Sequence, residues 1–190
     1  WEATRGENLL CSLLFRCTTQ DAPRYPRAVS LAARAACASI SGRTPRLKWP
    51  NDMVIGEAKL GGLLSVASPS EGFVVVGIGI NVGWAPDGAA KLRSDDSVAT
   101  NASSITPLHL LAAMLREVDH CLSLSDDQLH FIHRAALSTI GLRVRVEKTN
   151  GEVLIGSAVD VDSSSRLLVR DDHEVMHVID VGDVIHLRAG

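Results

Sequence analysis

The pattern of apolar residues changes near Gly141, and this change constrains the fold more than any other feature of the chain. Before it, apolar residues occur in continuous runs and at helical spacing. After it, short segments alternate apolar and polar residues and are separated by polar turns. Several short alternating strands at close spacing are typical of a small barrel. We therefore predict an α+β protein of two domains, with residues 1–141 forming a mixed central sheet flanked by helices and residues 142–190 forming a small SH3-like β-barrel.

The expected elements follow from periodicity and from helix-ending residues. Strands are predicted at 8–16, 47–49, 53–55, 59–67 and 73–82, helices at 27–40, 107–122 and 125–139, and barrel strands at 143–148, 152–162, 167–170, 175–179 and 184–187. The first strand is apolar throughout, the pattern of a strand covered on both faces. Thr106 suits a helix N-cap, Ser125 and Gln128 have capping-box spacing, and Gly141 should end the third helix. Asn150-Gly151 predicts a tight hairpin turn.

Composition excludes several classes of function. The net charge of −3 gives no electrostatic reason to expect nucleic acid or an anionic membrane as a partner, and no apolar run has the length of a membrane span. The four cysteines form no Cys-x-x-Cys pair, which favours reduced thiols in a cytoplasmic protein over disulfides or a metal site. Because the chain begins with Trp1 and not with Met, we expect a fragment, a processed product or an incomplete reading frame.

Lys59 is the first candidate for chemistry. In a regular strand the side chains of residues 59, 61 and 63 share one face, so Gly61 would leave the ammonium group open to a ligand. The neighbouring Gly62 lets the backbone approach a ligand closely. A lysine held in this way can pair with a carboxylate and stabilise charge that develops at a phosphoryl centre. An isolated lysine on a β-strand is more often exposed to solvent without a function, and only the flanking residues favour the functional interpretation.

Two further groups of residues accompany this lysine. Gly77 and Gly79 would leave a flat backbone floor on one face of a strand, and Asn81 on that face offers an amide that can donate and accept. The residues Asn51-Asp52 follow Pro50 in an expected turn, where Asp52 could face a Mg²⁺-phosphate or orient the lysine. Close strand packing and a purely structural turn are the alternatives for the two groups.

Other patterns indicate structure more than function. Trp49 is expected in the core. His130 and His133 lie three residues apart on a predicted helix, but with no third ligand near in sequence they are expected at a surface or interface, and no metal site is predicted. No Gly-x-Ser-x-Gly elbow of a serine hydrolase is present.

Three motifs together resemble the core of the biotin protein ligases. The segment Lys48-Trp49-Pro50-Asn51-Asp52 matches the family's Lys-Trp-Pro-Asn-Asp in full. The second motif is matched at Lys59, Leu60, Gly62 and Leu64, and the third, Gly-[Ile/Val]-Gly-x-Asn, at Gly77, Ile78, Gly79 and Asn81. The segments 156–162 and 182–184 are similar to the family's small C-terminal barrel. The resemblance covers the whole chain and implies a class II synthetase-like, biotin/lipoate ligase catalytic fold.

The resemblance also implies a mechanism and site residues. Lys59 looks like the catalytic lysine that contacts the biotin carboxylate and the α-phosphate of ATP. Asn81 looks like the residue that hydrogen-bonds adenine, and Asp52 like a carboxylate on the ATP side. Trp1 looks like a tryptophan that packs on adenine. Asn51, Gly62 and Gly79 complete the implied ligand-binding set.

Biotin and MgATP would give biotinyl-adenylate and pyrophosphate, and a lysine of the biotin carrier domain of a carboxylase would then displace AMP. Binding at an exposed strand edge could also make a homodimer.

The chain departs from the family at its N-terminus. The Gly-Arg-Gly-Arg-type loop of the family would lie just before Trp1 and is not in this chain. We therefore expect these 190 residues alone to form adenylate poorly or not at all. A lipoate ligase-type enzyme is one alternative, against which the Lys48–Asp52 spelling and the barrel argue. A non-catalytic remnant that binds biotin and regulates another protein is the other. Some family members carry a DNA-binding domain, but nothing in this chain supports contact with DNA.

Overall fold

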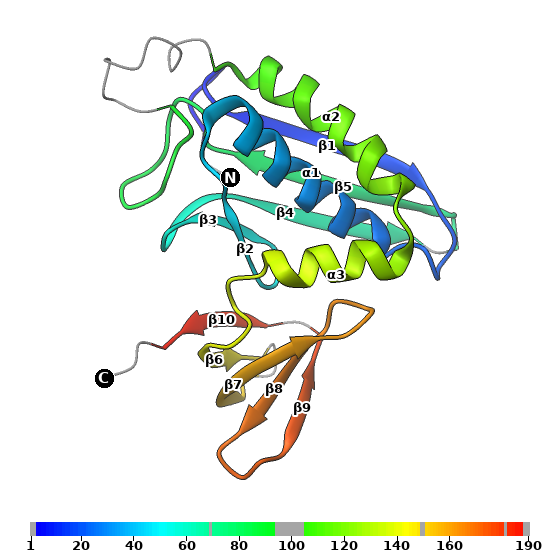
Figure 1. Ribbon diagram of the computed structural model, residues 1–190, viewed down its shortest axis with the longest axis vertical. Helices are drawn as coiled ribbons and strands as arrows, with labels where there is room; N and C mark the ends of the chain where they lie inside the picture. Colours follow the sequence, from blue (N-terminus) through cyan, green and yellow to red (C-terminus); the bar gives the residue numbers. More distant parts are fainter. Residues whose placement is uncertain (1–2, 69, 94–104, 149–150, 181, 188–190) are drawn as a thin grey trace.

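The computed structural model describes residues 3–68, 70–93, 105–148, 151–180 and 182–187. Its elements in chain order are β1 (Leu9–Arg16), α1 (Arg24–Ser41), β2 (Arg46–Lys48), β3 (Asp52–Ile55), β4 (Ala58–Ser68), β5 (Phe73–Ile80), α2 (Pro107–Ser123), α3 (Asp126–Ala136), β6 (Arg143–Glu147), β7 (Val153–Val161), β8 (Leu167–Asp171), β9 (Met176–Ile179) and β10 (Asp183–His186). Two sheets of five strands result, and α3 lies between them (Figure 1). The expected α+β class and the small C-terminal β-domain are confirmed.

The first sheet has the strand order β1-β5-β4-β3-β2. Every pairing between its named strands is antiparallel, and the parallel contact in the described residues is an isolated bridge between Leu47 and Leu137. The sheet is therefore antiparallel where a mixed one was expected, because hairpins connect β2 to β3, β3 to β4 and β4 to β5.

Helices α1 and α2 pack together over one face of this sheet (Figure 1). The α1 residues Ala28, Ala32 and Ala36 are fully buried, and their small side chains allow close packing. The other face of the sheet, which we call the open face, carries four exposed apolar side chains: Leu10, Leu14, Leu64 and Val66. The expectation that the first strand is covered on both faces is therefore wrong, since every second residue is exposed and those between are buried or partly buried.

The helix ends follow the sequence signals in two of three cases. The Thr106 hydroxyl accepts a hydrogen bond from the backbone of His109 at the start of α2, and Ser125 and Gln128 form the predicted capping box of α3. Helix α3 ends at Ala136 and not near Gly141. The residues that follow leave the helix because Ser138 donates its backbone N–H to Leu47 O, at 2.6 Å.

The second sheet has the order β10-β6-β7-β8-β9 and encloses buried residues such as Val144, Ala158 and Leu167. Gly151 in the β6–β7 turn has a φ of 83°, as its place in the predicted hairpin requires, whereas Asn150 lies outside the described residues. The division of the chain at residue 141 into two domains stays a prediction. None of the helices in the described part of the chain is long and apolar enough to cross a membrane.

Candidate functional site

The lysine and the carboxylate singled out in the sequence form an ion pair on the open face. Lys59 Nζ lies 2.6 Å from Asp52 Oδ1, and about half of the lysine side chain is exposed. The pair lies beside Gly62: a Cβ atom on residue 62 would lie 3.1 Å from Asp52 Oδ1 and 3.5 Å from Lys59 Cε. A bare glycine therefore keeps space next to a fixed cation and anion.

An irregular register in β4 determines which residues share a face with Lys59. Lys59 pairs with Val54 and Gly61 pairs with Met53, so Leu60 is an extra residue between the two pairs. The bulge brings Lys59 to the face of Gly62 and Leu64, and not to that of residues 61 and 63 as regular alternation predicted. Leu60 is fully buried.

Gly62 and Gly79 lie opposite each other in β4 and β5, and Gly77 of β5 pairs with Leu64. On the far side of β5, Leu10 and Ser12 of β1 pair with the same two β5 glycines. The open face thus has a floor without side chains, bordered by apolar residues at one side and by the Lys59–Asp52 pair at the other. This arrangement suits a flat ligand with an apolar body and an anionic end.

Asn81 lies just beyond β5 and is buried, with 4% of its surface exposed. Its Nδ2 donates to Ala90 O at 3.0 Å, and its Oδ1 accepts from Asn8 Nδ2 at 3.5 Å. Both ends of the amide therefore bond within the protein, where the sequence predicted an amide that faces a ligand. Asn8 in turn accepts from the backbone of Val82, which fixes the chain after the glycine strand.

The turn that carries Asp52 is held from two sides. On the side of β4, Asn51 Nδ2 donates to Leu63 O at 2.7 Å, and Leu63 N donates to Asn51 O at 2.8 Å. The amide of Asn51 is thereby used to shape the turn. Trp49 is in the core, as predicted, and the Trp49–Pro50 peptide bond is cis.

The same turn is bonded to the second sheet and the segment that leads to it. Trp49 Nε1 donates to Ser165 O at 2.8 Å, and the backbone N–H of Trp49 donates to Thr139 Oγ1 at 3.0 Å. Thr139 Oγ1 also lies 3.1 Å from His186 Nε2 of β10. The position of the Asp52 turn therefore depends on residues more than 80 positions away in the sequence.

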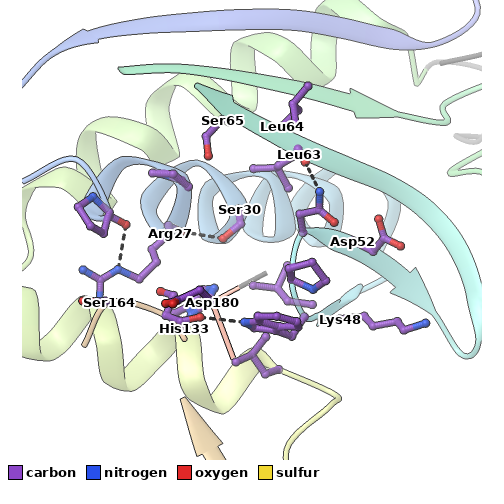
Figure 2. Close-up of a pocket in the computed structure, with 18 residues that line it drawn as sticks. Arg27, Ser30, Lys48, Asp52, Leu63, Leu64, Ser65, His133, Ser164 and Asp180 are labelled. Carbon is purple, nitrogen blue, oxygen red and sulfur yellow. Dashed lines mark hydrogen bonds between the residues drawn. The ribbon is translucent and has the colours of Figure 1, made fainter. Parts of the chain in front are cut away.

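A cavity of about 420 Å³ adjoins the turn and separates the first sheet from α3 and the loops of the second sheet (Figure 2). Asp52 lies at one end, and Arg27 and His133 lie at the other. Leu47, Trp49 and Leu63 line the wall between them. Neither Arg27 nor this cavity was found from the sequence, because an arginine in an alanine-rich helix gives no signal of what it will face.

Burial lowers the pKa of both titratable groups at the end of the cavity away from Asp52, which we call the inner end. His133 is 8% exposed, so it does not lie at a surface, one of its two expected places, and burial together with the charge of Arg27 lowers its pKa to about 4. It is therefore neutral at pH 7. Burial also lowers the pKa of Arg27, which is 6% exposed. Within the described residues, no group of three or more His, Cys, Asp or Glu is placed to hold a metal ion.

The structure thus brings Lys59, Asp52, Gly62 and Gly79 together, with Asn51 shaping the adjoining turn. Asn81 stands at the end of the glycine strand with its amide already bonded. Trp1 lies outside the described residues.

Comparison with known proteins gives matches in sequence and in fold. Residues 139–187 match the family model described as the biotin protein ligase C-terminal domain. The biotin–[acetyl-CoA-carboxylase] ligase of Mycobacterium tuberculosis is 36% identical over an alignment of 154 residues, which covers 75% of this chain and 53% of that protein. The bifunctional ligase/repressor BirA of Bacillus subtilis is 23% identical over an alignment of 193 positions, gaps included, which covers 94% of this chain and 58% of that protein. The chain spans a little over half the length of these curated relatives.

Solved structures share the fold. The biotin protein ligase of Aquifex aeolicus in complex with biotin and ATP has a TM-score of 0.75 at 20% identity, covering 96% of this chain and 79% of that one. The biotin protein ligase of Leishmania major in complex with biotinyl-5-AMP has a TM-score of 0.62 at 20% identity, covering 95% of this chain and 81% of that one. At this identity the match establishes the common fold.

Proposed function

We propose that this chain, which is similar to the biotin protein ligases in sequence and fold, takes part in the ATP-dependent attachment of biotin to a lysine of a carrier protein. The observation that carries the proposal is the Lys59–Asp52 ion pair beside the glycine floor of the open face. The names of the relatives add biotin, ATP and acetyl-CoA carboxylase, and we propose the biotin carrier domain of a carboxylase as the acceptor.

In the proposed first step, a biotin carboxylate oxygen attacks the α-phosphate of MgATP, and the bond to pyrophosphate breaks. Both reactants are anionic, so a cation at the point of attack lowers the electrostatic barrier. Lys59 would exchange its contact with Asp52 for contacts to the biotin carboxylate and the α-phosphate. Asp52 would keep the ammonium oriented before the ligands arrive.

In the second step, the neutral amine of the acceptor lysine attacks the carbonyl carbon of biotinyl-AMP. An amide bond forms, AMP leaves with the electron pair of the broken acyl–oxygen bond, and the amine loses one proton. The apolar neighbours of the floor, such as Leu10 and Leu64, would cover the biotin rings and keep water from the mixed anhydride. We propose Gly62 and Gly79 as the floor under biotin, and Asn81 with Trp1 on the adenine side. Asn81 would have to release Ala90 O to contact adenine.

The proposal is tested by measuring biotinyl-AMP by mass spectrometry after long incubation of the chain at high concentration with biotin and MgATP, because the chain alone is expected to form adenylate poorly. Lys59→Ala should lower its rate of formation by about 10²–10³-fold, the usual effect of removing one group that stabilises transition-state charge. Lys148→Ala is the matched control, because Lys148 also pairs with a carboxylate, Glu152, at 3.1 Å but lies just after β6 of the second sheet.

Calorimetric titration with biotin gives a readout that needs no turnover. Equal biotin affinity of the wild type and Lys59→Ala, with equal adenylate formation, would contradict the role of Lys59. Saturable binding of lipoate but not of biotin would instead identify a lipoate ligase-type site. A homodimer through an exposed strand edge stays a prediction.

A further inference from the structure

The cavity beside the Asp52 turn has a charged inner end that the proposed reaction does not use. Arg27, in the first turn of α1, lines this end with His133 of α3 and with Ser164 of the β7–β8 loop (Figure 2). These residues are distant in sequence, and three separate elements bring them together.

Arg27 carries a buried charge whose neutralisation is incomplete. Its Nε donates to Pro23 O at 3.2 Å, and no carboxylate of the described residues lies within ion-pair distance of its guanidinium group. The two carboxylates that act on it through space are committed elsewhere: Asp126 pairs with Arg24, and Asp162 pairs with Arg166 at 2.6 Å. Buried charges in proteins are ordinarily paired, because leaving water without a partner is costly.

The surroundings of Arg27 favour an anion with a hydrogen-bonding capacity. His133 is neutral at pH 7, so it neither adds to nor opposes the charge of Arg27, and Asp180, which also lines the cavity, is largely exposed and lies 3.7 Å from Arg166. Leu47, Trp49 and Leu63 give the wall of the cavity apolar surface, and an ion pair made beside such surface is stronger than one in water. A carboxylate on an apolar stem fits this combination, since a planar guanidinium group binds a carboxylate through two parallel hydrogen bonds.

The position of the cavity indicates where such a carboxylate comes from. Its outer end is lined by Asp52, the partner of Lys59, and its rim includes the exposed residues Leu64 and Ser65 of β4. A protein that delivers a lysine to the Lys59–Asp52 pair must lie against this rim. A side chain of that protein a few residues from its lysine can then enter the cavity.

Resting on the proposed function, we propose that Arg27 is a specificity-determining residue that binds an acidic side chain of the acceptor protein. The cavity thereby selects proteins that present a carboxylate near the acceptor lysine, and Arg27 contributes to docking of the acceptor while Lys59 acts on the reacting groups.

The test separates the two steps of the reaction. With the apo biotin carrier domain from the same genome as acceptor, Arg27→Gln should raise the KM for the carrier by about 30-fold or more, the usual consequence of removing one partner of a buried charge pair. The effect should appear in the transfer step and not in the rate of biotinyl-AMP formation. Arg27→Lys, which keeps the charge, should recover part of the affinity. Arg116→Gln, an exposed arginine of α2, is the control for the loss of one positive charge.

Exchanging each Asp and Glu of the carrier for its amide identifies the partner. One exchange should raise the KM with wild-type enzyme and have no further effect with Arg27→Gln. An unchanged KM for Arg27→Gln, or equal losses with every carrier variant, would overturn the proposal. A third result would also overturn the proposal: free pentanoate binds the wild type but not Arg27→Gln, while the substitution leaves the KM for the carrier unchanged. That result would assign the cavity to a small acid. If the wild type forms no adenylate, the proposed function fails, and calorimetric titration of the carrier into wild type and Arg27→Gln still decides the role of Arg27.

Discussion

Replacing Thr139 by valine should loosen the turn that carries Asp52. Thr139 is fully buried, and its Oγ1 accepts the backbone N–H of Trp49 at 3.0 Å. Valine has almost the same shape but no acceptor, so the Trp49 N–H would be left buried without a partner. The penalty for such a group is about 1–3 kcal/mol, and we expect Thr139→Val to lower the free energy of unfolding by about 2 kcal/mol. The loss of contact with His186 adds little, because that ring is partly exposed.

Thr139→Ser provides the matched comparison. Serine keeps the hydroxyl and loses one buried methyl group, which accounts for about 0.8 kcal/mol. Urea unfolding should therefore rank the proteins as wild type, then serine, then valine, with similar m-values. Adenylate formation should fall in the valine variant and be largely retained in the serine variant, since Trp49 adjoins the residues Pro50 to Asp52. A valine variant as stable as wild type, or less damaging than serine, would refute the role of this hydrogen bond.

Two further predictions concern neighbouring glycines and a buried histidine. Gly62→Ala places a Cβ atom 3.1 Å from Asp52 Oδ1, so it should weaken biotin binding measured by calorimetry and change the free energy of unfolding little. Gly61→Ala should lower the free energy of unfolding and change biotin binding little, because its Cβ atom would overlap the backbone oxygen of Gly79. A strong loss of stability in Gly62→Ala would contradict this assignment. His133 has a pKa of about 4 in the folded state and 6.5 in the unfolded state, so the unfolded chain binds more protons between these pH values. The contribution of neutral His133 to the free energy of unfolding should be fully present above pH 6.5 and should be lost, by about 3 kcal/mol, as the pH falls to 4 and below. Urea midpoints that fall with pH equally in His133→Leu would show another cause.

The sequence was sufficient for elements whose signals are local. The capping box at Ser125, the Thr106 cap and the turn at Gly151 depend on residues within a few positions, and the structure contains all three. The ion pair of Lys59 with Asp52 was accessible as well, because both residues flank one hairpin.

Features that depend on distant contacts escaped. The extra residue at Leu60 has no marker, since Lys-Leu-Gly-Gly-Leu-Leu is equally compatible with regular alternation. The first strand was misjudged because Leu10 and Leu14 are apolar yet exposed. Helix α3 stops early because Ser138 bonds to Leu47, a partner 91 positions away.

Because of the open face of the first sheet, the stability of this protein depends on the molecules around it as well as on its sequence. Leu10, Leu14, Leu64 and Val66 leave apolar surface in contact with water in the folded state. Whatever settles on that surface binds the folded chain and not the unfolded one, and so shifts the folding equilibrium by mass action. The melting temperature of the chain should accordingly rise with the logarithm of the concentration of any molecule that covers those strands.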